Sequence, residues 1–325
     1  MKNKEIQFEI RERKQNNNIK LSKLIDYELS NKVLTLTLNH PCNNMQSNEA
    51  AFEGWSIVLK SIFGSEIEQV FLNINAEIEI SKSSFHYNRL LWRIHNFSKM
   101  FAWFEMGNCK DAVTDFMTHK FVELVMNVPS RDRGPVMKSE GERLVEYLFI
   151  NQNEPYYLEL KTLIDADYIL NQVPVGLFQS NIKNDNKIFT GGSSAIDLLG
   201  FKGEDIIHLI ELKTENNIKL GVLSEFLFYA FIMQGLFISK DINYSKAEFP
   251  DSFSQYASLL RSGTVDKISG HLLCENYHPL LSNEVIALLN LGLSKFNISL
   301  DRLKYSYDKS RSEEHTSELQ SLSHL

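Results

Sequence analysis

Residues 194–213 read SAIDLLGFKGEDIIHLIELK, and this stretch decides the fold of the second half of the chain. It consists of two short apolar runs, 194–200 and 205–213, separated by Phe201-Lys-Gly-Glu204. Short runs rich in Ile and Leu that are bounded by glycine and charged residues predict buried β-strands joined by a turn. We therefore expect the two runs to pair as a β-hairpin.

Three charged residues interrupt these apolar runs. Asp197 lies in the first run, and Glu211 and Lys213 lie at the end of the second. Side chains two residues apart in a strand point to the same face, so Glu211 and Lys213 project together while Leu212 enters the core. Pairing of the two strands brings Asp197 beside Glu211. The alternative for these three residues is an interstrand salt bridge at a sheet edge.

Two carboxylates and an ammonium in one cleft are the groups that metal-assisted cleavage of a phosphodiester requires. Carboxylate oxygens are hard ligands that hold Mg²⁺ (or Mn²⁺), so Asp197 and Glu211 are the expected metal ligands. Lys213 can orient the attacking water or stabilise the negative charge that develops in the transition state. The trio therefore predicts a catalytic site.

The segments around the hairpin predict an α/β unit. Periodic apolar faces indicate helices that start at Ser139 and Pro155 and a long helix over 220–236. The runs 168–179 and 270–275 have the pattern of strands. This order of helices and strands indicates a sheet flanked by helices.

Four segments of this half resemble PD-(D/E)XK nuclease-like proteins, which have the restriction-endonuclease-like fold. The segments are QVPVGLF at 172–178, GGSSAIDLLG at 191–200, IELK at 210–213 and GVLSEFLFYA at 221–230. The resemblance covers about 139–279, and the first part of the chain lies outside it. It implies an αβββαβ core and dependence on a divalent metal ion.

The resemblance also implies roles for single residues. Asp197, Glu211 and Lys213 occupy the acidic, acidic and lysine positions of the family motif. A carboxylate on the first helix, for which we choose Glu142, reaches the metal through water; a capping-box role is the alternative for Glu142. Ile196 stands where the name-giving proline would precede the aspartate, which is a departure from the motif.

A second implied feature is a contact to nucleic acid on the long helix. Glu225 and Tyr229 stand where some branches carry Gln-x-x-x-Tyr for contact to the strand, and the glutamate is a departure. The alternative is a helix with buried apolar residues in which these two polar groups satisfy each other or the backbone. A second Glu-x-Lys copy at Glu159 and Lys161 lies in a helical pattern with no aspartate strand before it, so we interpret it as a solvated helix face.

The first part of the chain predicts a separate mixed α+β domain. Alternating runs predict strands at 33–38 and 70–80, and apolar residues at helical spacing predict helices over 49–63, 87–104 and 115–126. The stretch NVPSRDRGP at 127–135 has the composition of a linker. We expect an N-terminal domain of unknown role at 1–128, a linker at 129–138 and the nuclease-like domain at 139–310.

Residues 311–325, RSEEHTSELQSLSHL, show no apolar periodicity. Over 311–321 they look like the in-frame translation of a widely used sequencing-library adapter. We expect this segment to be foreign, and a natural disordered tail is the alternative. His315 and His324 are therefore not interpreted as ligands.

Composition is that of a globular protein, because 43% of the residues are hydrophobic and 23% are charged. Cys42, Cys109 and Cys274 lie far apart with no Cys-x-x-Cys pair, which predicts buried thiols and neither a zinc knuckle nor a disulfide framework. The charged start of the chain has no secretory h-region. The apolar stretch 220–238 contains polar residues, so we expect a buried helix, no membrane span and a cytoplasmic protein.

Together these features predict a Mg²⁺-dependent nuclease that hydrolyses DNA, in defence, restriction or repair. The net charge of -7 argues against broad electrostatic capture of nucleic acid, so any basic patch must be local. The alternative is a catalytically inert module of the same fold that binds nucleic acid or a protein partner. A homodimer is left open.

Overall fold

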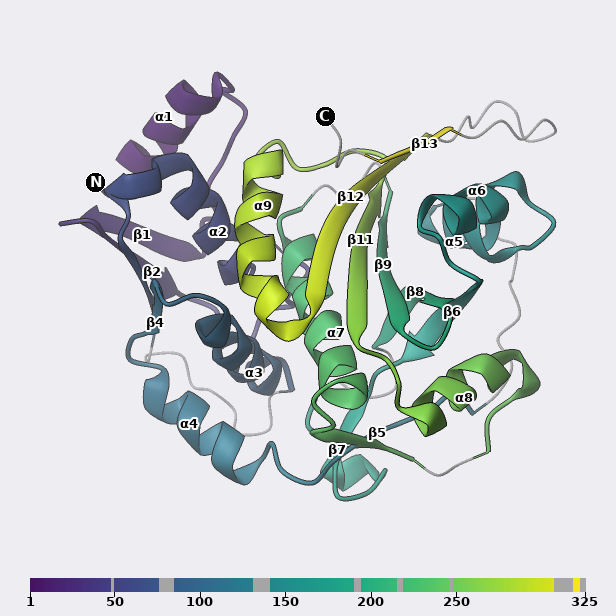
Figure 1. Ribbon diagram of the computed structural model, residues 1–325. Helices are drawn as coiled ribbons and strands as arrows, with labels where there is room; N and C mark the ends of the chain where they lie inside the picture. The colour runs from purple at the N-terminus through teal and green to yellow at the C-terminus, as the bar shows by residue number, and fades with distance from the viewer. Residues whose placement is uncertain are drawn as a thin grey trace. The chain divides into compact units, whose positions relative to one another are not determined.

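The computed structural model describes residues 1–47, 50–75, 85–130, 141–189, 194–214, 219–245, 248–306 and 318–321. These residues form a mixed α/β protein with several sheets (Figure 1). The chain divides into two compact units. Unit 1 contains residues 1–122, 219–227 and 278–292, and unit 2 contains residues 123–218, 228–277 and 293–325.

Unit 1 is built on a sheet of four strands. The strands are β1 (Ile25–Ser30), β2 (Val33–Leu38), β3 (Gln69–Ile74) and β4 (Phe104–Met106). The helices are α1 (Asn3–Lys14), α2 (Phe52–Phe63), α3 (Phe85–Met100), α4 (Lys110–His119) and nearly all of α9 (Asn283–Leu293). The order is β1-β2-β3-β4, with β1 antiparallel to β2 and the other pairs parallel. The parallel strands are connected through α2 and α3.

The core of unit 1 contains a buried ion pair. Arg93 on α3 donates from Nε to Oε1 of Glu53 on α2 over 2.7 Å and from Nη2 to Oε2 of the same carboxylate. Nη2 of Arg93 also donates to the carbonyl of Ala50, and the Ser224 hydroxyl donates to Glu53 Oε2. Both charged side chains are almost fully buried. Hydrogen bonds on both partners offset the desolvation of these charges.

Unit 2 is built on a six-stranded sheet and a small three-stranded one. The strands are β5 (Leu124–Met126), β6 (Tyr168–Pro174), β7 (Leu177–Gln179), β8 (Ala195–Lys202), β9 (Ile206–Lys213), β10 (Ile242–Tyr244), β11 (Lys267–Cys274), β12 (Ile298–Ser306) and β13 (Glu318–Ser321). The helices are α5 (Glu142–Ile150), α6 (Pro155–Leu163), α8 (Ser254–Ser262) and, from Phe228 onward, α7 (Gly221–Phe237).

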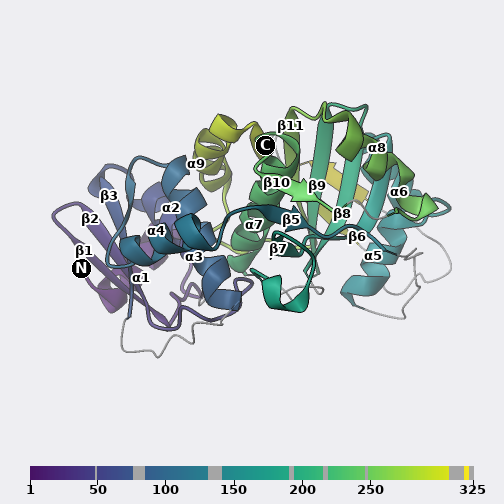
Figure 2. The same ribbon diagram turned by 90° about the horizontal axis from the view of Figure 1, so that it is seen from below.

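The large sheet has the order β13-β12-β11-β9-β8-β6. Figure 2 shows β11, β9, β8 and β6 side by side in this sheet. The strands β6, β8 and β9 are mutually antiparallel neighbours, whereas β11 is parallel to both β9 and β12. A hairpin connects β8 to β9, and the parallel partner β11 follows only after α7 and α8, as a crossover requires.

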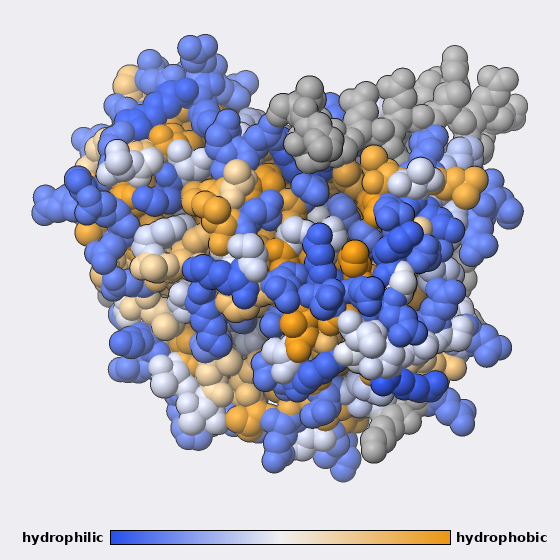
Figure 3. Space-filling view, in the orientation of Figure 1, coloured by the Kyte–Doolittle hydropathy of each residue, from blue (hydrophilic) through white to orange (hydrophobic). Residues whose placement is uncertain are grey.

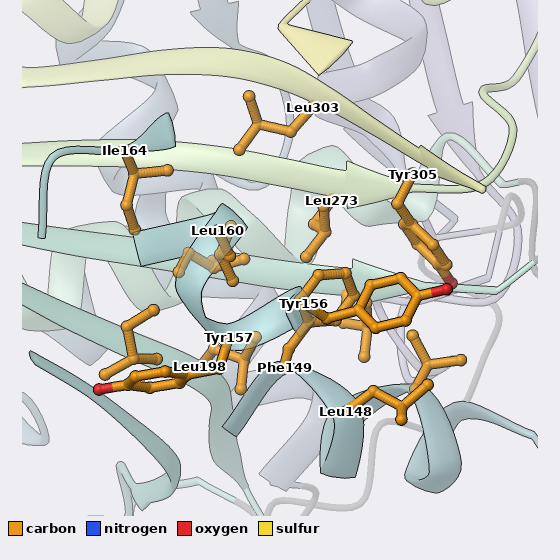
Figure 4. Close-up of a cluster of buried hydrophobic side chains, with 14 of the residues drawn as sticks. Leu148, Phe149, Tyr156, Tyr157, Leu160, Ile164, Leu198, Leu273, Leu303 and Tyr305 are labelled. Atoms are coloured by element: carbon orange, nitrogen blue, oxygen red, sulfur yellow. The ribbon is translucent and has the colours of Figure 1, made fainter. Parts of the chain in front are cut away.

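An aromatic and aliphatic cluster joins α5 and α6 to the large sheet. Figure 4 shows Phe149, Tyr156 and Tyr305 together in this cluster. The ring of Phe149 makes edge contacts with both tyrosines, with centroid separations of 5.5 Å in each case. Such aromatic pairs add stabilisation to the burial of apolar area. The cluster fixes α5, which carries the predicted site residue Glu142, against the strands.

Most elements predicted for the second half are confirmed within one to three residues. The hairpin forms as expected, since Lys202 pairs with Ile206 and Gly203 takes the positive φ of a tight turn. The helix at Pro155 and the long helix near 220–236 are present. The predicted start at Ser139 lies outside the described residues, and Gly141 is the residue that precedes α5.

Three expectations for the first half are wrong in part. The helix expected over 87–104 ends at Met100, because residues from Phe104 pair with β3 as strand β4. The helix expected over 115–126 ends at His119, and Leu124–Met126 instead pairs with β7 and β10. The strand expected over 70–80 ends at Ile74, and residues 76–80 lie outside the described part. Sheet pairing overrides helical spacing of apolar residues at such short segments.

The domains expected from sequence are continuous segments of the chain, whereas each observed unit consists of several separate segments. Unit 1 includes 219–227 and 278–292, which belong to the segment expected to form the nuclease-like domain. Most of the expected linker lies outside the described residues. Within 311–325, the segment Glu318–Ser321 forms β13 against β12. An edge strand exposes unpaired backbone groups, so a short segment can add to it whatever its origin.

On the face shown in Figure 3, hydrophobic residues form patches scattered among hydrophilic ones. Among the helices of the described residues, none has the length and apolar character that a membrane crossing requires.

The described part contains three free cysteines, of which Cys109 and Cys274 are buried and Cys42 is half-buried.

Candidate active site

The β8–β9 hairpin places Asp197 next to Glu211. Leu198 pairs with Ile210, so Asp197 and Glu211 are the next residues along the two strands. Beyond this pair the backbone N–H of Leu212 donates to Asp197 Oδ2 over 3.1 Å. The carboxylate thus takes the place of a backbone acceptor at the end of the ladder. This bond restrains the side chain of Asp197 at the open end of the hairpin, away from the turn.

The ammonium of Lys213 lies within 4 Å of all three carboxylates that were predicted for the site. Its Nζ lies 2.5 Å from Glu211 Oε1, 3.8 Å from Asp197 Oδ2 and 3.8 Å from Glu142 Oε1. The four residues predicted as catalytic therefore meet around one cation. They come from three elements: α5 supplies Glu142, β8 supplies Asp197, and β9 supplies Glu211 and Lys213.

The four side chains of the site differ in their exposure to solvent. The side chain of Glu211 is 1% exposed and that of Lys213 is 7% exposed, whereas Asp197 is 19% and Glu142 is 39% exposed. Leu212 between the two strand residues is fully buried in the cluster under α5 and α6, as the alternation of a strand requires. The site therefore has a buried inner pair and an accessible acidic rim.

Glu146 is an acidic neighbour that the sequence did not single out. It lies one helical turn after Glu142 on α5, and its two carboxylate oxygens accept bonds from Asn171 Nδ2 at 2.8 Å and Gln172 Nε2 at 3.2 Å. Burial raises the pKa of Glu146, and the charge of Asp197 raises it further. The spacing of two glutamates at i and i+4 on the first helix was the signal that could have identified it.

Tyr305 and Cys274, from strands β12 and β11, lie near the end of β9. The Tyr305 hydroxyl of β12 donates to the backbone carbonyl of Lys213 over 3.3 Å. Cys274 of β11 stands opposite Lys213 in register. Burial raises the pKa of Cys274 to about 12, although the charge of Lys213 opposes the shift. This thiol is therefore an inert packing group and not a nucleophile at neutral pH.

The two residues predicted to contact nucleic acid are buried. Glu225 in unit 1 is 3% exposed, and Gln46 Nε2 donates to its Oε1. Tyr229 in unit 2 is 5% exposed. The burial of both side chains favours the alternative of a buried helix. The side chain of Gln46, which that alternative did not name, is a hydrogen-bond partner of Glu225. The second Glu-x-Lys copy, Glu159 and Lys161, lies on helix α6 as expected.

The donor set of the site fits a hard divalent cation. Asp197 and Glu211 offer carboxylate oxygens within 4 Å of one ammonium, which shows that their field already favours a positive charge. The described residues contain no group of three or more His, Cys, Asp or Glu side chains with the geometry to hold a metal ion. A cation with two protein carboxylates suits Mg²⁺, which usually keeps several waters and binds substrate phosphate oxygens.

Comparison of the chain with family models, curated proteins and solved structures gave no match.

Proposed function

We propose that the chain is a divalent-metal-dependent nuclease whose active site consists of Asp197, Glu211, Lys213 and Glu142. The observation that carries the proposal is the meeting of all four side chains around Lys213 Nζ, although they come from three elements and span more than seventy positions in sequence. A salt bridge at a sheet edge needs one acid and one base. Three carboxylates around one buried ammonium exceed that need.

The order of elements supports a restriction-endonuclease-like core. Helix α5 precedes the antiparallel strands β6, β8 and β9, then α7 and then β11, which is parallel to β9; α6, β7, β10 and α8 are additional elements between them. Without the additional elements, this order is compatible with the αβββαβ core that the sequence resemblance implies, and it supports the proposal. Asp197 lies near the start of β8, and Glu211 and Lys213 lie at the end of β9, so all three are at the same end of this antiparallel pair.

Each residue has a separate chemical part in the proposed reaction. Asp197 and Glu211 would hold the divalent ion, which polarises the scissile phosphate and stabilises its developing charge. Lys213 orients the attacking water through its ammonium and lies beside the negative charge of the transition state. Glu211 accepts a hydrogen bond from Lys213 and keeps that ammonium in place. Glu142, the most exposed of the four, orders water at the rim.

DNA is the substrate that we propose for this site. The acidic net charge limits the contact to a local surface, because phosphate binding depends on nearby Lys and Arg. Arg143 neighbours Glu142 at the start of α5 and is exposed, so it can contact a phosphate beside the site. In this proposal the phosphodiester is split by water into a phosphate monoester and a hydroxyl.

The test is cleavage of end-labelled single- and double-stranded DNA, with RNA in parallel, by the full chain in Mg²⁺, Mn²⁺ or EDTA. We expect cutting with either metal and none in EDTA. Asp197→Asn and Lys213→Ala should both lower the cleavage rate by about a hundredfold or more, whereas Lys161→Ala, in the second Glu-x-Lys copy, should not. A folded chain that binds labelled DNA but cuts no substrate would support the inert binding module instead.

A further inference from the structure

Two consecutive residues of strand β6 bind one carboxylate. Asn171 donates from its amide to Glu146 Oε1, and Gln172 donates from its amide to Glu146 Oε2. Consecutive side chains of a regular strand point to opposite faces of the sheet and cannot both reach one small group. An irregularity of the backbone must therefore bring the two amides together.

That irregularity is the left-handed conformation of Gln172. Its φ is +50°, a region that β-carbon sterics disfavour for residues other than glycine, asparagine and aspartate. Asn171 pairs with Leu198 and Val173 pairs with Ile196, so Gln172 stands opposite Asp197 between two regular pairs. The strained position in β6 and the acidic residue of β8 thus lie side by side.

We propose that Gln172 is a positioning residue, whose strained backbone turns the Asn171 and Gln172 amides onto Glu146 and holds that carboxylate beside Asp197 to strengthen cation binding. Backbone strain of this kind persists only where the surrounding structure over-determines it, and it concentrates at functional sites. The inference rests on the proposed function, since it concerns the same divalent cation.

The physical basis is charge and restraint. Gln172 donates to Glu146 and stands opposite Asp197 in the sheet, so a fixed Glu146 adds to the negative field at the cation-binding carboxylates. Two amide donors restrain the carboxylate without neutralising it, which a lysine or arginine would do. Groups that orient the ligands of a metal act in the same way, although they do not touch the ion.

The experiment compares Mn²⁺ binding, by titration calorimetry, in the full chain and in Gln172→Gly. Glycine adopts positive φ without steric cost, so this variant removes the amide and keeps the backbone path. Asn297→Gly is the matched control, because Asn297 also has a positive φ, of 58°, and is exposed on another loop of unit 2. Thermal unfolding of each variant is measured alongside.

We expect Gln172→Gly to keep or raise the unfolding temperature while its Mn²⁺ affinity falls by about tenfold, the scale seen for groups that orient metal ligands. Asn297→Gly should leave the affinity unchanged. If Gln172→Gly does not fold, Asn171→Ser carries the test with the same expected loss. Parent-like affinity in the folded variant would overturn the inference and leave the proposed function intact. No Mn²⁺ binding by the parent chain would instead overturn the proposed function, and the inference with it.

Discussion

The ammonium of Lys213 lies 2.5 Å from the carboxylate of Glu211, two residues earlier on the same strand. Both side chains are nearly excluded from solvent, so the pair replaces the hydration that each charge lost on folding. A buried pair of this kind is a poor source of net stability, because desolvation offsets much of its attraction. A buried pair at the end of β9 is compatible with the chemical role proposed for these two residues.

Removing one member of this pair should destabilise unit 2. Lys213→Met keeps the aliphatic stem but leaves the buried Glu211 carboxylate without its ammonium, so we expect the free energy of unfolding to fall by about 3 kcal/mol. Urea denaturation followed by circular dichroism measures it. The double variant Lys213→Met/Glu211→Gln removes both charges and should recover most of the loss. No recovery would mean that packing, and not charge, explains the effect.

Asp197→Asn should separate chemistry from stability. Asparagine keeps an oxygen that can accept the bond from the Leu212 N–H but loses the negative charge. We expect the unfolding midpoint to change little and the DNA cleavage rate to fall by about a hundredfold or more, the scale of removing one preorganised electrostatic group. A variant that unfolds early and cuts at the parent rate would contradict this assignment.

The ion pair in the core of unit 1 should be a large determinant of stability. Arg93→Met leaves Glu53 buried without its guanidinium partner, so we expect a loss of about 3–5 kcal/mol in the free energy of unfolding. The exposed pair of Lys32 and Glu68 is the control. Lys32→Met should change the free energy of unfolding far less than Arg93→Met, because surface ion pairs contribute little. Equal effects of the two substitutions would refute the role of burial.

Two stacked histidines should make the protein sensitive to acid. His208 Nδ1 and His271 Nε2 lie 3.1 Å apart on β9 and β11. Burial lowers the pKa of His208 to about 4 and that of His271 to about 3. Between these values and about 6.5 the unfolded chain binds protons that the folded chain does not. The contribution of the two neutral histidines to the free energy of unfolding is therefore fully present above about pH 6.5. It decreases as the pH falls toward about 4.

The double variant His208→Leu/His271→Leu measures this contribution. Urea midpoints recorded between pH 7 and pH 4 should fall less steeply for the variant than for the parent chain. A slope equal to that of the parent in the double variant would show that other groups carry the acid sensitivity.

The candidate site was predictable because its signal is local. Glu211 and Lys213 lie on one strand, Asp197 lies on the strand before it, and a short turn connects the two. Alternation along a strand and hairpin pairing are enough to bring these three together. The choice of Glu142 depended on the family resemblance, and the structure brings its carboxylate within 3.8 Å of Lys213.

Other features depend on tertiary context that the residue pattern does not carry. Gln172 has a left-handed backbone between two regular pairs of β6 and β8, and its amide bonds to Glu146 on α5. Short strands such as Leu124–Met126 form only because partner strands lie beside them, so helical spacing of apolar residues misassigned that segment. Likewise, buried Glu225 accepts a hydrogen bond from Gln46, which is far away in sequence.

The most direct test of the central claim is the single-turnover rate of DNA cleavage in Mg²⁺ for the parent chain, Lys213→Ala and Lys161→Ala. The two lysines share the same Glu-x-Lys spacing, but only Lys213 lies among the gathered carboxylates. We predict that Lys213→Ala lowers the rate by about a hundredfold or more and that Lys161→Ala stays within about twofold of the parent. Equal rates for the two folded variants, or no metal-dependent cleavage by the parent, would contradict the account.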